Sequence, residues 1–165
     1  KGILEFAKAA QIIREHNPEA RFLLFGYPDD HVDSIDESEI INEWNEKYGI
    51  EYMGYSSNPI HSINECSVFV LLSYKEGTPR VVLEAMAMGR PIITTDTPGC
   101  RETVIDQLNG FLVPKKDYLN AASSMKVLLD PDLRQKMGNE SRRYCESKFD
   151  VHNINDFLFN EMRVK

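Results

Sequence analysis

The sequence predicts an α/β fold, a Rossmann-like three-layer α/β/α sandwich around a mostly parallel sheet of about six strands. The first observation is that short apolar runs, rich in β-branched and aromatic residues, alternate with segments whose apolar residues recur at helical spacing. The second is that residues 68–95 read strand, loop, helix and strand in succession, which is how a parallel sheet is built. The length of 165 residues suits one domain with a substantial core.

The first third of the chain contains strands and helices with clear boundaries. The expected elements are a helix at residues 2–16, a strand at 21–25, a helix at 37–48, a strand at 50–53 and a short helix at 59–65. Pro18 ends the first helix, and Gly49 ends the second. The second helix is expected to bury Trp44 together with Ile40 and Ile41.

The central unit begins with the run 68–72, which predicts a strand buried on both faces. A polar loop follows, and then Thr78 as N-cap and Pro79 as first residue of a helix. Gly89 ends this helix. A second buried strand is expected at 92–95.

The last third continues the alternation. After a turn at 97–99 the expected elements are a short helix at 101–105, a strand at 111–113 after the Asn109-Gly110 turn, and helices at 117–129, 132–148 and 151–164. The final helix is expected to expose Phe157 or Phe159.

Composition excludes several classes of protein. The net charge of −7 argues against a nucleic-acid polymer as partner. The acidic stretch 29–46 contains Asp29, Asp30, His31 and Asp33, but their spacing matches neither a calcium loop nor a zinc site, so no metal is expected.

The chain has three cysteines, which are widely spaced and fit a reducing cytosol. Cys100 follows a Pro-Gly turn and is expected to be accessible, either as an incidental thiol or as a nucleophile. No signal peptide and no apolar run of transmembrane length are present, so any membrane contact is expected to be peripheral.

The start of the central helix predicts a binding site. A helix N-terminus presents unpaired N–H groups to anions, and ligands of open parallel sheets lie beyond the carboxyl ends of the strands. Glu76 lies in the loop at that edge, and Glu84 lies inside the helix. Carboxylates accept hydrogen bonds from hydroxyls, so a nucleotide sugar fits the arrangement. Two glutamates eight residues apart are also common on solvated helices, and the spacing alone leaves both interpretations open.

The segment EGTPRVVLEAMAMGRPIITTD closely resembles the E-x7-E segment of retaining glycosyltransferases with the GT-B fold, in glycosyltransferase family 4. Its continuation PGCRETVIDQLNGFLVP resembles the same family, and the strong match spans residues 68–114. The EG-x-P variant resembles the subgroup that builds bacterial surface polysaccharides and lipid-linked oligosaccharides.

The resemblance implies roles for individual residues. Glu76 would hold hydroxyls of the donor sugar, and Glu84 would hold the ribose. Backbone N–H groups near the helix start would face sugar or phosphate, and Lys1 and Arg80 would neutralise the leaving diphosphate. The resemblance thus implies that Glu76 and Lys1 are the catalytic residues. It implies that the other substrate-binding residues are Gly77, Thr78, Pro79, Arg80, Val81 and Glu84. It would place Gly54 and Tyr55 near the nucleotide base, although Tyr55 is more simply expected to be a packing residue. Pro79 lacks an N–H group and therefore makes one contact fewer.

The resemblance also implies a larger protein. The abrupt start of the chain predicts that residues 1–165 are one domain, the C-terminal donor-binding half, with the N-terminal acceptor domain absent and the helix at 151–164 packing back toward it. The full cytoplasmic or membrane-peripheral enzyme would transfer a hexose or N-acetylhexosamine from a UDP-sugar to a sugar hydroxyl of a glycan or lipid-linked glycan, without metal or cofactor. The fragment alone would be inactive. The alternatives are a catalytically silent nucleotide-sugar-binding module and a nucleotide-sugar 2-epimerase.

Overall fold

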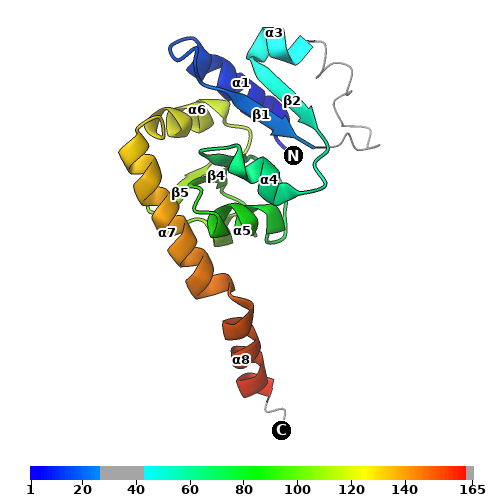
Figure 1. Cartoon of the computed structure of the whole chain (residues 1–165), viewed down its shortest axis with the longest axis vertical. Helices are drawn as coiled ribbons and strands as arrows, with labels where there is room; N and C mark the ends of the chain where they lie inside the picture. Colours follow the sequence, from blue (N-terminus) through cyan, green and yellow to red (C-terminus); the bar gives the residue numbers. More distant parts are fainter. Residues whose placement is uncertain (27–42, 163–165) are drawn as a thin grey trace.

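The computed structural model describes residues 1–26 and 43–162, and Figure 1 shows their arrangement. The strands are β1 (Phe22–Phe25), β2 (Ile50–Gly54), β3 (Phe69–Leu71), β4 (Ile92–Thr95) and β5 (Gly110–Val113). The helices are α1 (Ile3–Arg14), α3 (Asn45–Tyr48), α4 (Pro59–Asn64), α5 (Arg80–Ala87), α6 (Tyr118–Val127), α7 (Pro131–Phe149) and α8 (Val151–Met162), with a 3-10 turn η2 (Arg101–Thr103).

The strands form two parallel sheets. β1 pairs with β2, with Phe22 opposite Ile50, and β4 lies between β3 and β5, with Ile93 opposite Val70 and Phe111. The expectation of one sheet of about six strands is therefore wrong for the described part of the chain, where β1 and β3 do not pair. β1 and β3 are half-buried because neither pairs on its second edge, whereas all four residues of β4 are buried. Burial of residues 68–72 on both faces was thus overestimated.

Helices cover both faces of the β3–β4–β5 sheet, which gives the Rossmann-like α/β/α sandwich predicted from the sequence. On one face, α1 and α6 pack through Ile13 and Met125 against Ile93. On the other face, α4, α5 and α7 surround a core that includes Val82 and Ile92. The parallel unit β3–α5–β4 lies at the centre of this arrangement, as the sequence predicts.

The β1–β2 sheet has a separate small core. Trp44 and Tyr48 pack with Ile50 and with two alanines of α1, Ala7 and Ala10. The rings of Trp44 and Tyr48 meet edge to face, with centroids 5.5 Å apart. Because the other face of α1 packs on the three-stranded sheet, this helix joins the two sheets.

Most helix boundaries agree with the sequence, with two exceptions. The short helix expected at 101–105 is only the 3-10 turn η2, Arg101–Thr103, and the chain is extended at Val104. The second exception is the start of α5. Helix α5 begins at Arg80, and Pro79 is its N-cap residue, with ψ 114°. The Pro79 carbonyl accepts the first helical hydrogen bond from the Val82 N–H at 3.0 Å, so Thr78 lies outside the helix and does not cap it. Ile40 and Ile41, which were expected in the helix that buries Trp44, lie outside the described residues.

The C-terminal helices follow the predicted pattern. Asp130 caps α7, and its side chain accepts hydrogen bonds from the N–H groups of Asp132 and Leu133. Helix α8 extends away from the rest of the chain in Figure 1 and exposes Phe157 and Phe159, as expected. Among the described residues, no helix has the length and apolar character needed to cross a bilayer.

Candidate functional site

The first turn of α1 lies against the end of β3. Gly2 has a left-handed backbone (φ 72°), and a Cβ atom there would lie 2.1 Å from the Leu72 carbonyl oxygen. Only glycine permits this approach. It places Lys1 beside the loop that follows β3, where its ammonium group forms an ion pair with Glu76.

Glu76 is held ionised in this position. Its side chain is 17% exposed, whereas that of Lys1 is 69% exposed. Burial alone would raise the pKa of Glu76, but hydrogen bonds from Lys1 and Ser73, together with the positive charge of Lys1 and of the chain's amino group, outweigh burial and lower it. The structure therefore brings together the two residues for which the sequence predicts catalytic roles, and it supplies an anionic acceptor for hydroxyl hydrogen bonds.

The loop after β4 supports the loop that carries Glu76. Gly99 has φ 84°, and a Cβ atom there would lie 2.2 Å from the Gly77 carbonyl oxygen and 2.6 Å from that of Glu76. Cys100, next in the chain, is fully buried, so the expectation that it is accessible is wrong.

The start of α5 is open to ligands. Gly77, Thr78 and Arg80 are exposed, and Val81 is half-buried. The N–H groups of Arg80 and Val81 occupy the first turn of α5, where no intrahelical acceptor exists. The buried Pro79 has no N–H group to offer. The turn thus presents two backbone donors and an exposed guanidinium group to an anion.

Glu84 is one turn further along α5 and is half-buried. Its Oε2 atom is buried and has no hydrogen-bond partner among the described residues. A buried carboxylate oxygen without a donor is costly, by about 1–3 kcal/mol. This orphaned oxygen is therefore the strongest sign in the site that a ligand with hydroxyl or amide donors completes it.

The residues expected near a nucleotide base lie on the other sheet. Gly54 is the last residue of β2, with φ 70°, and Tyr55 follows it. The side chain of Tyr55 is 72% exposed, so the expectation that Tyr55 is an ordinary packing residue is wrong. Both residues lie at the carboxyl end of a parallel strand, the end that also carries Glu76 in the three-stranded sheet.

Metal ligands do not gather in the described part of the chain, where no three His, Cys, Asp or Glu side chains come together. Asp29, Asp30, His31 and Asp33, considered as ligands from the sequence, lie outside the described residues. Glu102, in η2, forms an ion pair with Lys148 of α7 at 2.9 Å.

Sequence reasoning missed one feature next to Glu76. Tyr74 is half-buried beside Glu5, and the ammonium of Lys116 lies 5.5 Å from the centroid of the Tyr74 ring. Burial, followed by the neighbouring Glu5 carboxylate, raises the pKa of Tyr74 to about 12. No sequence signal joins these residues, because they come from α1, the β3–α5 loop and the β5–α6 loop.

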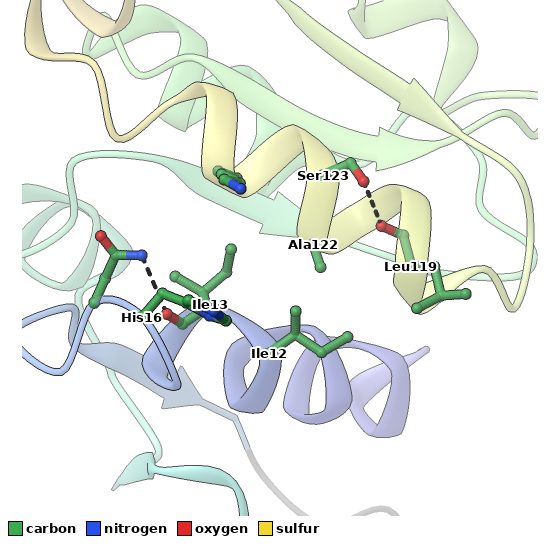
Figure 2. A pocket seen from close by; sticks show the side chains of 8 residues that line it. Ile12, Ile13, His16, Leu119, Ala122 and Ser123 are labelled. Carbon is green, nitrogen blue, oxygen red and sulfur yellow. Dashed lines mark hydrogen bonds between the residues drawn. The ribbon is translucent and has the colours of Figure 1, made fainter.

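A hollow of about 270 Å³ lies between α1 and α6 (Figure 2). Its apolar wall includes Ile12 and Leu119, and its polar residues include His16, Asn17 and Lys126. The Asn17 side chain donates to the Ile13 carbonyl at 3.2 Å. Because none of the residues assigned to the site from the sequence lines it, this hollow is distinct from the candidate site.

Comparison with known proteins agrees with this geometry. The family model described as glycosyl transferases group 1 matches residues 1–144. The chain is 32% identical over 150 residues to the capsular polysaccharide biosynthesis glycosyltransferase CapM of Staphylococcus aureus, covering 90% of this chain and 39% of CapM. It is 31% identical over 132 residues to N,N'-diacetylbacillosaminyl-diphospho-undecaprenol alpha-1,3-N-acetylgalactosaminyltransferase of Campylobacter jejuni, covering 80% of this chain and 33% of that enzyme. The chain thus spans well under half the length of these relatives.

The fold is also found in solved structures. A crystal structure of S. aureus TarM, a point mutant in complex with fondaparinux, α-GlcNAc-glycerol and UDP, superposes with a TM-score of 0.83 at 19% sequence identity. The match covers 96% of this chain and 32% of TarM. The likeness identifies the fold as one half of the GT-B architecture.

Proposed function

Because the chain belongs to the family of glycosyl transferases group 1, we propose that it is the donor-binding domain of a retaining glycosyltransferase of family 4 that uses a UDP-sugar. The observation that carries this proposal is the orphaned Oε2 atom of Glu84, buried one turn inside a helix whose first turn is open to a phosphate. A ribose hydroxyl bound to that oxygen would bring the attached diphosphate near the helix start. TarM, which has the same fold, was crystallised with UDP.

Three sources of positive charge would bind the diphosphate: the start of α5, Arg80 and Lys1. The N–H groups of Arg80 and Val81 and the dipole of α5 point at it, and the exposed Arg80 guanidinium adds charge. Lys1 approaches from α1 and already lies at the site, paired with Glu76. A bound diphosphate would compete with Glu76 for this ammonium group and so free the carboxylate to accept sugar hydroxyls.

Catalysis then rests on stabilising a leaving group. Cleavage of the sugar–phosphate bond builds negative charge on the diphosphate, and donors already aimed at it lower the barrier. Glu76 positions the sugar rather than attacking it, so no protein nucleophile is required. As the bond between the anomeric carbon and the diphosphate oxygen breaks, the acceptor oxygen bonds to that carbon with retention, and the proton of the acceptor hydroxyl passes to the leaving diphosphate. No metal is needed, since Lys1, Arg80 and the helix start supply the positive charge.

The complete protein is proposed to add an N-terminal acceptor-binding domain and to transfer a hexose or N-acetylhexosamine to a sugar hydroxyl. The relatives named for capsular polysaccharide biosynthesis and for a diphospho-undecaprenol-linked acceptor support polysaccharide or lipid-linked glycan synthesis as its role. Helix α8, with its exposed Phe157 and Phe159, is proposed to pack against that domain. Without the acceptor domain, the 165-residue chain should bind the donor and transfer nothing.

The two glutamates make the proposal testable by calorimetric titration of the chain with UDP and with UDP-glucose or UDP-N-acetylglucosamine. Glu84→Ala should weaken binding of UDP by about tenfold or more, because the ribose loses hydrogen bonds to a charged acceptor. Glu76→Ala should weaken UDP-sugar more than UDP. Glu146→Ala is the matched control, since Glu146 lies on α7 and pairs with Arg142. Unchanged UDP affinity in Glu84→Ala would refute the assignment of Glu84 to the ribose.

A further inference from the structure

A lysine in strained backbone geometry lies beside the candidate site. Lys116 has φ 62°, a left-handed conformation that glycine adopts readily and other residues adopt at a cost. This geometry holds its ammonium 5.5 Å from the centroid of the Tyr74 ring. Tyr74 stands two residues before Glu76 in the β3–α5 loop. The chain therefore accepts backbone strain at a position that brings a positive charge to the edge of the site.

A second lysine and tyrosine extend this arrangement. Lys8 of α1 has its ammonium 5.3 Å from the centroid of the Tyr118 ring, at the first residue of α6. Because α1 and α6 cover one face of the sheet and α5 covers the other, Lys8 and Tyr118 lie on the face opposite the start of α5. Glu76 lies within the β3–α5 loop, which runs from the end of β3 to the start of α5.

The region carries unpaired positive charge although the chain is acidic. Lys75 and Lys115 flank Tyr74 and Lys116 in sequence and are exposed. None of the four lysines (Lys8, Lys75, Lys115 and Lys116) forms an ion pair with a described residue. The acidic neighbours are Glu5, beside the Tyr74 phenol, and Asp117, whose side chain caps α6 by accepting from the Asn120 N–H at 2.9 Å. Positive charge is thus in excess in a chain of net charge −7.

We infer that Lys8, Lys115 and Lys116, set around Tyr74 and Tyr118, form a subsite for a phosphate group carried by the acceptor. The inference rests on the proposed function, because an acceptor is needed only if the protein transfers a sugar. An anion held here would lie near the loop that carries Tyr74 and Glu76 and apart from the donor phosphates at the start of α5, so donor and acceptor could be bound at the same time.

The tyrosines support this role through their rings. Burial, followed by a hydrogen bond to the Glu5 carboxylate, raises the pKa of Tyr74 to about 12, so its hydroxyl is engaged within the protein and its ring carries the Lys116 ammonium. Lysine ammonium groups are strongly hydrated point charges that bind phosphate without the planar fork of arginine. The combination favours phosphate over the planar carboxylate of a uronic acid.

Amide NMR of the chain saturated with UDP tests the inference, with inorganic pyrophosphate as the probe, since UDP then occupies the donor site. Pyrophosphate should shift the signals of residues 115–118 and of Lys8. The double variant Lys8→Gln/Lys116→Gln should weaken pyrophosphate binding by about tenfold and change UDP affinity by less than about twofold. Lys126→Gln is the control, because Lys126 lies at the far end of α6 and lines the hollow of Figure 2.

Lys116→Gly separates a binding role from a structural one. Glycine relieves the strain at φ 62°, so the melting temperature should stay the same or rise, while pyrophosphate affinity falls. If the lysine served only to pack on Tyr74, the melting temperature would fall and pyrophosphate binding would not change.

The outcomes distinguish this inference from the proposed function. Absence of UDP binding refutes the proposed function, and pyrophosphate alone then tests the lysines. Three results would each overturn the phosphate subsite. The first is that pyrophosphate shifts only signals at the start of α5, and the second is that the double variant binds pyrophosphate as tightly as the unchanged chain. The third is that glucuronic acid causes larger shifts than pyrophosphate.

Discussion

The two sheets of this molecule differ in how they are buried and in what they carry. The β3–β4–β5 sheet has a fully buried central strand, helices on both faces and the loops that hold Glu76 and Gly99. The β1–β2 sheet has one small core around Trp44 and a half-buried strand, β1. The three-stranded sheet is therefore the rigid support of the site, and the two-stranded sheet depends on α1 for its place beside it.

This difference matters for function because α1 serves both sheets. Its first residues bring Lys1 to Glu76, and its buried alanines contact both cores, Ala9 on one side and Ala7 on the other. Damage to the three-stranded sheet should therefore remove stability and site together. Damage to the two-stranded sheet should remove stability locally and spare the helix start that binds phosphate.

The largest expected effect comes from the core of the three-stranded sheet. Ile93 is fully buried in β4, so Ile93→Ala should destabilise the chain by about 4 kcal/mol and lower amide hydrogen-exchange protection throughout. Trp44→Ala leaves a comparable cavity in the other core, where Trp44 is 1% exposed. Protection should then fall in α3 and β2 and persist in β4 and α5. Equal loss of protection everywhere in Trp44→Ala would show that the two sheets unfold as one unit.

The next effect concerns the contact between the two site loops. Gly99→Ala places a Cβ atom 2.2 Å from the Gly77 carbonyl oxygen in a left-handed backbone. The loop that carries Glu76 must move, with a loss of about 3 kcal/mol in unfolding free energy and a weaker affinity for UDP-sugar. Urea unfolding and calorimetric titration measure the two quantities.

Gly54→Ala is the matched control in the two-stranded sheet. Gly54 has nearly the same backbone angle, φ 70°, but a Cβ atom there meets no atom within 4 Å. Only the backbone strain remains, so the loss should be about 1–2 kcal/mol. If the two variants lose the same stability, the close approach of Gly99 to Gly77 carries no energy, and the support assigned to the β4 loop is wrong.

The sequence predicts the three-stranded sheet better than the two-stranded one. The unit β3–α5–β4 follows from local patterns, since its strands are apolar runs and Gly89 ends its helix. Two other predictions were wrong, namely that β3 is buried on both faces and that β1 belongs to one large sheet. Both properties depend on contacts with residues far away in the chain, which the local hydrophobic periodicity does not reveal.

The candidate site was predicted in part for the same reason. Lys1 and Glu76 form an ion pair, and their action at one site stays a prediction. The sequence predicted Thr78 as the N-cap of α5, whereas the structure has Pro79 there. N-cap preferences are averages over many helices and do not determine the backbone geometry of one helix start. The left-handed backbone of Lys116 could not be predicted, because no residue pattern in the sequence indicates that a lysine adopts this conformation.

A smaller effect is expected in the pKa values of two carboxylates, Glu76 beside the three-stranded sheet and Glu51 in the two-stranded sheet, each of which forms an ion pair. Lys1→Gln should raise the pKa of Glu76 and leave Glu51 unchanged, while Arg21→Gln should raise the pKa of Glu51, which the Arg21 hydrogen bond lowers most. Both folded-state pKa values lie below the unfolded ones. The stabilisation is thus complete above the unfolded pKa and is lost as pH falls through the folded pKa. Carboxyl-carbon NMR titrations measure both groups, and a change at Glu51 in Lys1→Gln would mean that the two sheets are electrostatically coupled.

The smallest effect is expected from Arg21→Ala. Arg21 donates to both oxygens of Glu51, at 2.9 and 2.6 Å, but its side chain is 63% exposed. Exposed pairs contribute about 0.2–1 kcal/mol, so urea unfolding should show a loss within that range. Because β1 and β2 begin at this edge and the site lies at the opposite one, UDP affinity should not change. A loss above about 2 kcal/mol would mean that the ion pair, rather than packing around Trp44, holds the two-stranded sheet together, and the proposed dependence of that sheet on α1 would have to be abandoned.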